Sequence, residues 1–314
     1  MVLPADTHVH SEFSWDTGGP QSPTAAGTMR RSCARAVRIG LPAIIFTEHL
    51  DISGWRAAPE DFDEHERHLI DQEGLMQPPP LDIVGYLDAI ERCRHEFPDL
   101  RILTGVEFGQ PHLDHQAANS VVDLADLDRV NGSLHTLPYA GHRSEPVTMF
   151  REVSDPAEVI WAYLSEVPAM VDGGDFDVFT HIDYAARYWP TEEHGPFDHL
   201  PFEEGFRQAM RAIASSGRPL EMNTGRPLRQ WIPQWWAEEG GQAVSFGSDD
   251  HTTTGLAANF HETTALMDHF GFHPGSRPED FWTRQSSGRG AGRTRPHEGS
   301  DAPPKLKRHK PPTS

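Results

Sequence analysis

The sequence predicts a parallel α/β barrel. Short, β-branched apolar segments recur along the 314 residues, and stretches with helical periodicity separate most of them. This regular alternation favours a parallel barrel over a β-sandwich or a helix bundle. The predicted strands are seven in number: 2–8, 42–49, 101–109, 128–135, 177–183, 219–225 and 243–251.

Several of the intervening segments carry clear helix signals. Apolar residues follow one helical stripe in residues 82–97. Asp155 is placed to cap the helix that follows it, and Gly217 is placed to end the helix that begins near residue 203.

Two segments interrupt the alternation. Residues 50–81 form a long connection after the second strand, and its length indicates a loop over the barrel mouth that acts as a lid. Residues 284–314 are rich in Gly, Pro, Arg, Lys and Ser, which is typical of a disordered basic tail. We therefore expect one folded domain over residues 1–283.

Composition limits the location and the partners. The net charge is −20; the predicted tail holds eight basic and two acidic residues, which leaves −26 for residues 1–283 and disfavours nucleic acid as a partner. No apolar stretch approaches the length of a membrane span, and the N-terminus lacks a secretory signal. With only two cysteines, Cys33 and Cys93, a cytoplasmic location is expected. The sequence does not indicate an oligomeric state.

Residues of the metal-ligand type lie at the ends of six predicted strands. The carboxyl ends of parallel barrel strands meet at one face, so these side chains are expected to form one ring, which Asp16 joins from the loop after the first strand. The candidates are six histidines and three carboxylates: His8, His10, Asp16, His49, Glu107, His135, His181, Asp249 and His251.

The spacing of these residues suits several metal ions. In the pairs His8–His10 and Asp249–His251, alternate residues of a strand point to the same side. Nine ligands exceed the needs of one ion and predict two or three divalent ions. Glu107 and Asp249 could each bridge two ions through their two oxygens. Nitrogen and oxygen ligands without thiolate suit Zn, Mn or Fe, and they do not choose among these metals.

Six motifs also resemble a known family. "DTHVHSEFSWD", "FTEH", "GVEFG", "GSLH", "THID" and "GSDDH", in this order, resemble the polymerase and histidinol phosphatase (PHP) superfamily over about residues 3–272, and most of all its monofunctional histidinol phosphatases. The resemblance implies a distorted seven-stranded (β/α)7 TIM-like barrel of the PHP type. It also implies a trinuclear metal centre that uses the same nine ligands.

The resemblance further implies a phosphatase reaction on a small phosphorylated substrate. It points to hydrolysis of L-histidinol phosphate to L-histidinol and phosphate, a step of histidine biosynthesis. Catalytic and phosphate-binding arginines are implied at Arg187 and at either Arg226 or Arg229, of which Arg229 is preferred.

Three other functions compete with this one. Another PHP phosphoesterase, acting on a different phosphate ester or a nucleotide, would share the metals. A metal-dependent amidohydrolase would usually need a bridging lysine, and no lysine lies near a predicted strand end. A noncatalytic PHP module would be expected to lack some of the ligands, whereas here the set is complete.

Overall fold

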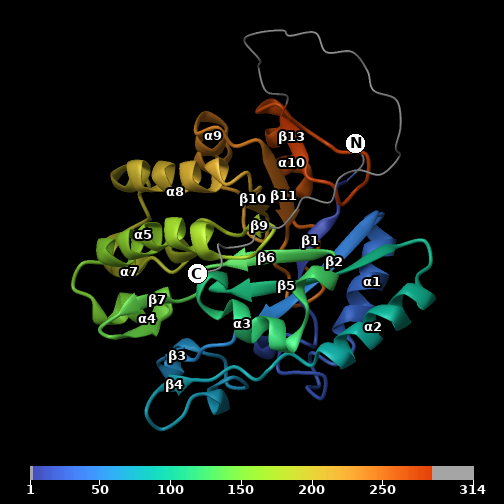
Figure 1. Cartoon of the computed structure of the whole chain (residues 1–314), viewed down its shortest axis with the longest axis horizontal. Helices are drawn as coiled ribbons and strands as arrows, with labels where there is room; N and C mark the ends of the chain where they lie inside the picture. The colour runs from blue at the N-terminus through green and yellow to red at the C-terminus, as the bar shows by residue number, and fades with distance from the viewer. Residues whose placement is uncertain (1–2, 285–314) are drawn as a thin grey trace.

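The protein has an α/β fold, and its main sheet is strongly curled (Figure 1). The structure, a computed structural model, describes residues 3–284. Nine strands lie in the order β1-β2-β5-β6-β9-β10-β11-β13-β12. The first seven pair in parallel: β1 (Asp6–Val9), β2 (Ala43–Leu50), β5 (Arg101–Gly109), β6 (Arg129–Ser133), β9 (Val178–Phe179), β10 (Leu220–Asn223) and β11 (Ala243–Gly247).

Each of the predicted strands overlaps one of these parallel strands, and the α/β class is confirmed. The described sheet nevertheless has nine strands, because β12 (Phe272–His273) and β13 (Trp282–Arg284) join it in antiparallel orientation. Strands of two or three residues leave little periodicity to detect in a sequence.

The sheet curls until its first strand meets the segment that follows β11. The Asp249 amide donates to the His8 carbonyl at 2.7 Å, and the His10 amide donates to the Asp250 carbonyl at 3.0 Å. The start of β11 pairs instead with β13, so the two ends of the sheet meet only near the carboxyl ends of their strands. This contact brings the His8–His10 and Asp249–His251 pairs together.

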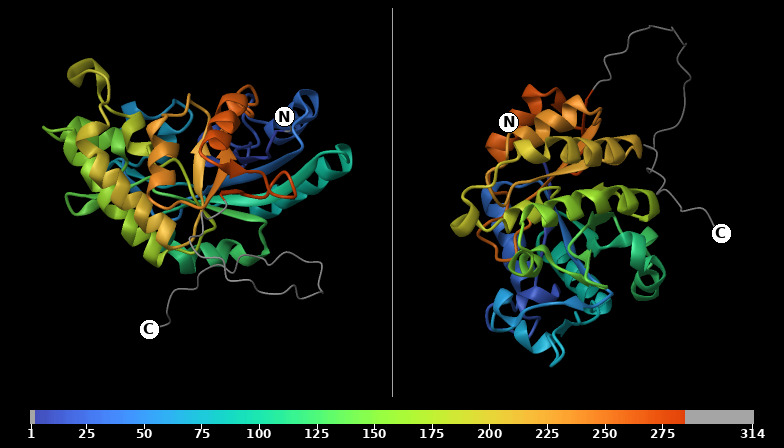
Figure 2. Two further views of the ribbon diagram at one scale, coloured as in Figure 1. Left: turned by 90° about the horizontal axis from the view of Figure 1, so that it is seen from above. Right: turned by 90° about the vertical axis from the view of Figure 1, so that its left-hand side faces the viewer.

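Helices surround the curled sheet (Figure 2). They are α1 (Thr28–Ile39), α2 (Ile83–Glu96), α3 (Pro111–Val121), α4 (Pro146–Glu152), α5 (Ala157–Gly173), α6 (Tyr184–Arg187), α7 (Thr191–His194), α8 (Glu203–Ser215), α9 (Trp231–Glu238) and α10 (Phe260–His269).

Local sequence signals explain where several helices begin and end. The Asp82 side chain accepts a hydrogen bond from the Gly85 amide and caps α2, and Asp155 accepts one from the Ala157 amide at the start of α5. Helix α8 is followed by Gly217, whose φ of 77° favours glycine and stops the helix.

A second, small sheet lies beside the main one and includes part of residues 50–81. Its order is β4-β3-β8-β7, with β3 (Trp55–Arg56) and β4 (Leu75–Met76) from that segment and β7 (Leu137–Tyr139) and β8 (His142–Ser144) from the chain after β6. Strands β3 and β4 are at the bottom of Figure 1. Trp55, Phe62 and Met76 form a separate small core there. The predicted long loop therefore has secondary structure and a core of its own.

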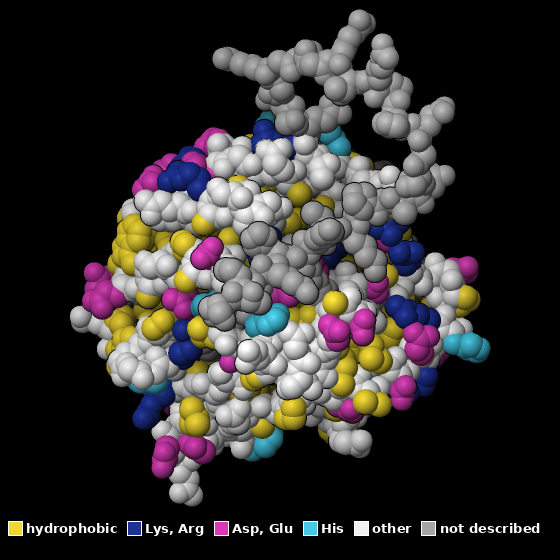
Figure 3. All heavy atoms as spheres, in the orientation of Figure 1, with side chains coloured by type: hydrophobic (Ala, Val, Ile, Leu, Met, Phe, Trp, Pro, Cys, Tyr) yellow, Lys and Arg dark blue, Asp and Glu magenta, His cyan; other side chains and the backbone are white. Residues whose placement is uncertain are grey.

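Acidic and basic side chains are interspersed on the face drawn in Figure 3. Among residues 3–284 we find no helix with the length and apolar character that crossing a bilayer requires. The predicted basic tail, 284–314, lies outside the described residues except for Arg284, which belongs to β13.

Candidate active site

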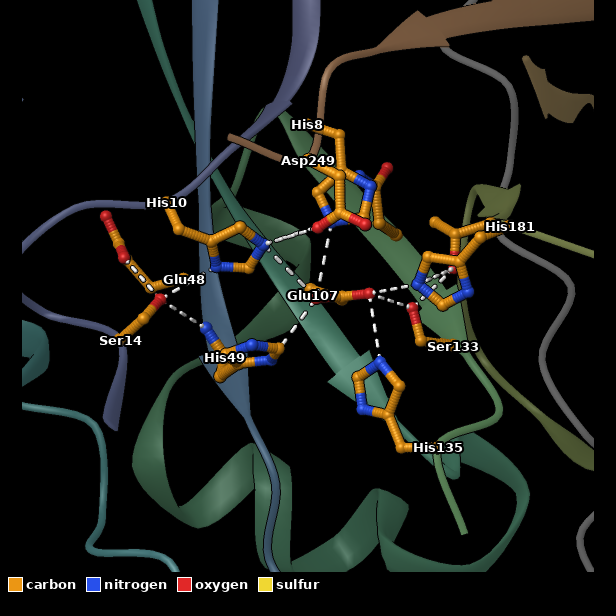
Figure 4. A network of polar contacts seen from close by, with 12 residues as sticks. His8, His10, Ser14, Glu48, His49, Glu107, Ser133, His135, His181 and Asp249 are labelled. Carbon is orange, nitrogen blue, oxygen red and sulfur yellow. Dashed lines mark hydrogen bonds and ion pairs between the residues drawn. The ribbon is translucent and has the colours of Figure 1, made fainter. Parts of the chain in front are cut away.

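Glu107 is the centre of the predicted ligand set (Figure 4). It lies near the end of β5, and its side chain is buried. Its Oε1 is 2.7 Å from Nε2 of His181 and 3.1 Å from Nε2 of His135. Its Oε2 lies 3.2 Å from Nε2 of His8 and 3.3 Å from Nε2 of His10. One carboxylate thus faces histidines from three other segments of the chain.

The remaining predicted ligands adjoin this group. His49, on β2, has Nδ1 3.2 Å from Oε2 of Glu107 and Nε2 3.2 Å from Oδ2 of Asp16. His251 has Nε2 2.9 Å from the same Asp16 oxygen. Oδ1 of Asp249 lies 3.5 Å from Nε2 of both His8 and His10. All nine predicted ligands are therefore brought together.

Asp249 reaches the cluster through an unusual backbone conformation. Its φ is 57°, in the left-handed region that aspartate tolerates better than most residues. The hydrogen bond from its amide to the His8 carbonyl holds this turn against β1.

The cluster has the properties of a site for several cations. Buried polar atoms of its members make no hydrogen bond within residues 3–284: Asp16 Oδ1, His49 Nδ1, Glu107 Oε2 and His181 Nδ1. Nε2 of His8 and Nε2 of His10 lie only 3.1 Å apart. Converging imidazoles and carboxylates with unused lone pairs fit divalent metal ions well. Four overlapping groups could hold an ion: His10–His49–His251, His8–His10–Glu107–Asp249, His49–Asp51–His135 and Glu107–His135–His181.

The electrostatics favour ionised carboxylates in the cluster. Burial by itself would raise the pKa of Glu107, but the positive charges of His8 and His135 outweigh burial and hold that pKa well below its usual value. Burial by itself would lower the pKa of His8, yet the charges of Glu221 and Glu107 raise it well above its usual value. The carboxylates are thus ready to bind cations at neutral pH.

Glu221 is a functional candidate that the sequence reasoning missed. It lies on β10, and its Oε1 is 2.6 Å from Nδ1 of His8. Its Oε2 accepts hydrogen bonds from the His181 amide at 3.0 Å and the Asn223 side chain at 3.2 Å. A carboxylate on the far nitrogen of a metal-ligating histidine fixes the tautomer and the ring orientation. The available signal was a glutamate inside the buried strand segment "PLEMNTG".

Asp51 and Ser14 support other histidines in the same way. Oδ1 of Asp51 is 3.3 Å from Nδ1 of His135, and the indole of Trp15 donates to its Oδ2 at 2.9 Å. Oγ of Ser14 is 2.8 Å from Nδ1 of His10. Neither residue carries a sequence pattern that identifies this role.

The three predicted arginines lie at different distances from the cluster. Nη1 of Arg187, at the end of α6, donates to Oδ2 of Asp249 at 3.1 Å. Nε of Arg229 lies 3.4 Å from Oδ2 of Asp183, whose Oδ1 is 3.5 Å from Nε of Arg187. Arg226 is exposed and donates to the Arg187 carbonyl at 3.5 Å.

A cavity of about 230 Å³ opens beside the cluster. Seven predicted ligands and Arg187 line it, whereas Arg226 and Arg229 do not. Its other walls come from the loop after β1, from the 50–81 segment and from the segments that follow β8 and β9. These further lining residues are Trp15, Asp51, Asp61, Phe62, Glu66, Glu145, Val147, Tyr184 and Tyr188.

The PHP domain family matches residues 6–225, more than two thirds of the chain. This chain belongs to the PHP domain family. Most of the ligand cluster lies within the matched residues of this PHP-domain protein, and Asp249 and His251 lie beyond them.

Two curated relatives and one solved structure resemble the PHP-domain protein. The histidinol-phosphatase of Lactococcus lactis subsp. lactis is 25% identical over 279 residues, which cover 85% of this chain and 91% of that protein. The probable histidinol-phosphatase of Clostridium acetobutylicum is 22% identical over 280 residues, with coverages of 86% and 94%. A crystal structure of the L. lactis histidinol phosphate phosphatase, complexed with zinc, L-histidinol and phosphate, has the same fold, with a TM-score of 0.67, 24% identity and coverages of 87% and 95%.

The contact between Glu221 and His8 gives a first testable prediction. We expect Glu221→Gln to weaken metal binding by about 10- to 100-fold, because glutamine cannot hold His8 as strongly in the required tautomer. Competition with a chromophoric chelator measures the change. Glu166→Gln is the matched control, since Glu166 lies 3.0 Å from Nε2 of His112 outside the cluster. Equal metal affinity of Glu221→Gln and wild type would contradict the positioning role.

Proposed function

We propose that this PHP-domain protein is a metal-dependent phosphomonoesterase, and specifically a histidinol phosphatase. The reaction is hydrolysis of L-histidinol phosphate to L-histidinol and phosphate. The observation that carries the proposal is the position of Arg187, which borders the cavity and contacts Asp249 at the edge of a nine-residue ligand cluster. The names of the two curated relatives support the choice of substrate.

The proposed metal ligands are the nine residues predicted from the sequence, and they would hold two or three divalent ions of Zn, Mn or Fe. Such ions, when bound, acidify a water molecule and supply positive charge for the phosphate oxygens. Glu107 has an oxygen directed at each of two histidine groups, which supports its assignment as a bridging ligand.

Arg187 is assigned to the phosphate. Its guanidinium lines the cavity and offers several donors in a fixed plane, which suits the equatorial oxygens of a phosphoryl group as negative charge builds on them. Arg229 is assigned a supporting part through Asp183, whose two oxygens face the two arginines. Arg226 remains the weaker candidate of the pair, because its side chain is exposed.

Other features belong to the same proposal. We assign the seven parallel strands to the distorted (β/α)7 barrel of the PHP type, with residues 1–283 as the catalytic domain. Asp61, Phe62 and Glu66 line the cavity, which supports a lid role for residues 50–81. Two free cysteines, Cys33 and Cys93, support a cytoplasmic location.

A metal-reconstituted substrate panel tests the function. Protein stripped with a chelator should lose hydrolysis of L-histidinol phosphate by at least about a thousandfold, and Mn or Zn should restore it. The panel includes a nucleoside monophosphate, a sugar phosphate and phenyl phosphate. Faster turnover of one of these than of L-histidinol phosphate would favour another PHP phosphoesterase, and full activity of the stripped protein would refute the proposal.

A further inference from the structure

Glu145 is an acidic residue in the cavity wall that neither the ligand cluster nor the proposed phosphate site uses. It follows β8 directly, and only 8% of its surface is exposed. Its side chain lines the cavity together with Val147, Tyr184 and Tyr188. Within residues 3–284 its carboxylate has no hydrogen-bond donor and no ion-pair partner. Its carboxylate oxygens are not among the fully buried atoms and open onto the cavity, so a donor that enters the cavity can pair with this largely buried side chain.

Two other acids of this wall, Asp61 and Glu66, each have at least one partner within the described residues. Oδ1 of Asp61 is 2.5 Å from a guanidinium nitrogen of Arg151, and its Oδ2 accepts from the Thr148 hydroxyl at 2.9 Å. Glu66 accepts a hydrogen bond from the Asp63 amide at 2.6 Å and is half-buried. Only Glu145 among these three is left to pair with something that enters the cavity.

The surroundings of Glu145 favour a cation as its partner. Burial raises the pKa of Glu145 to about 8, so a positive charge beside it would favour the ionised form. A nearby ammonium group would stabilise the ionised carboxylate and supply the missing donors. The aromatic rings of Tyr184 and Tyr188 beside it suit a ligand that combines positive charge with apolar or aromatic surface.

We propose that Glu145 is a specificity-determining residue that binds the protonated amine of the substrate alcohol. The site would then select phosphate monoesters of amino alcohols over uncharged esters. This inference rests on the proposed phosphatase function, because it assigns the alcohol end of the substrate to the wall that carries Glu145. In L-histidinol phosphate the amine is attached to the carbon next to the ester-bearing carbon, so one molecule could reach both Glu145 and the phosphate site.

The test compares two substrates in the metal-loaded protein. Glu145→Gln should lower the ratio of kcat/KM for L-histidinol phosphate to kcat/KM for phenyl phosphate by about 10- to 100-fold, mainly through KM, since a hydrogen bond to a charged group is lost. Glu166→Gln, a matched control outside the cavity lining, should change this ratio by less than about threefold. A ratio that is unchanged in Glu145→Gln overturns the inference, and so does an equal loss on both substrates.

A binding measurement separates this inference from the proposed function. L-histidinol and its deaminated analogue 3-(imidazol-4-yl)propan-1-ol are compared as inhibitors of phenyl phosphate hydrolysis and by calorimetry. Wild type should bind L-histidinol at least about tenfold more tightly than the analogue, and Glu145→Gln should lose that preference. If L-histidinol phosphate proves a poor substrate but the preference for the amine is present, the histidinol phosphatase proposal fails and the amine site stands. Equal binding of both alcohols by wild type overturns the amine site, whether or not the variant folds.

Discussion

Glu107→Gln is expected to lower phosphatase kcat by at least about a thousandfold and to reduce the number of bound metal ions. The carboxylate has one oxygen toward His135 and His181 and the other toward His8 and His10. Glutamine keeps the size but removes the negative charge and replaces one acceptor with a donor. An NH2 group that faces the imidazole ligands would repel a metal ion from the position between Glu107 and these histidines.

The measurements are metal stoichiometry by mass spectrometry and kcat across a titration with Mn or Zn. Glu166→Gln serves again as a control that neutralises a half-buried carboxylate on a histidine outside the cluster. Thermal unfolding followed by circular dichroism reports whether the variant is folded. Glu107→Gln protein with a full metal complement and kcat within about tenfold of wild type would show that Glu107 is not a bridging ligand.

Arg187→Ala is expected to lower kcat/KM for phosphate ester hydrolysis by about 100- to 1000-fold, the usual cost of removing one preorganised charge-stabilising donor. The guanidinium borders the cavity, and its Nη1 contacts Asp249. The loss should affect kcat as well as KM, because negative charge on the phosphate oxygens increases toward the transition state. Arg187→Lys should recover only part of the activity, since an ammonium group lacks the planar fork of donors.

The contact with Asp249 requires a control for metal loss. Metal content is therefore measured for Arg187→Ala, and a full complement would place the defect in substrate handling. Arg207→Ala is the comparison variant, because Arg207 pairs with Glu203, Glu238 and Glu239 on the outside of the molecule. A kcat/KM of Arg187→Ala within about threefold of wild type would remove Arg187 from the phosphate site.

The candidate ligand cluster could be predicted from the sequence because residues at strand ends can be recognised locally, and the fold brings these ends together at one face. Eight of the nine candidate ligands lie near or just beyond the end of a strand, and parallel strands end at one face, so the identity of strand-end residues was sufficient for these eight. The alternation in His8–His10 predicts both rings on the same side, and their Nε2 atoms lie 3.1 Å apart.

The supporting residues could not be predicted because they depend on contacts between distant segments. Glu221 is 213 residues from His8 in sequence, and only the pairing of β10 within the curled sheet places them 2.6 Å apart. Glu145 reaches the cavity because the segment after β6 forms the β7–β8 hairpin, which the predicted strand pattern did not include. The choice between Arg226 and Arg229 likewise depends on Asp183, which faces the latter.

The second sheet has a consequence for how substrate range can change. It joins two segments of the chain that leave the main sheet after β2 and after β6, and a strand of one segment pairs with a strand of the other. A graft of one segment alone would leave those edges unmatched, so we expect the two to be exchanged together, apart from Asp51 and His135 at their starts, which belong to the site. A change of substrate alcohol during evolution is therefore expected to replace both segments together, while the candidate metal cluster stays the same.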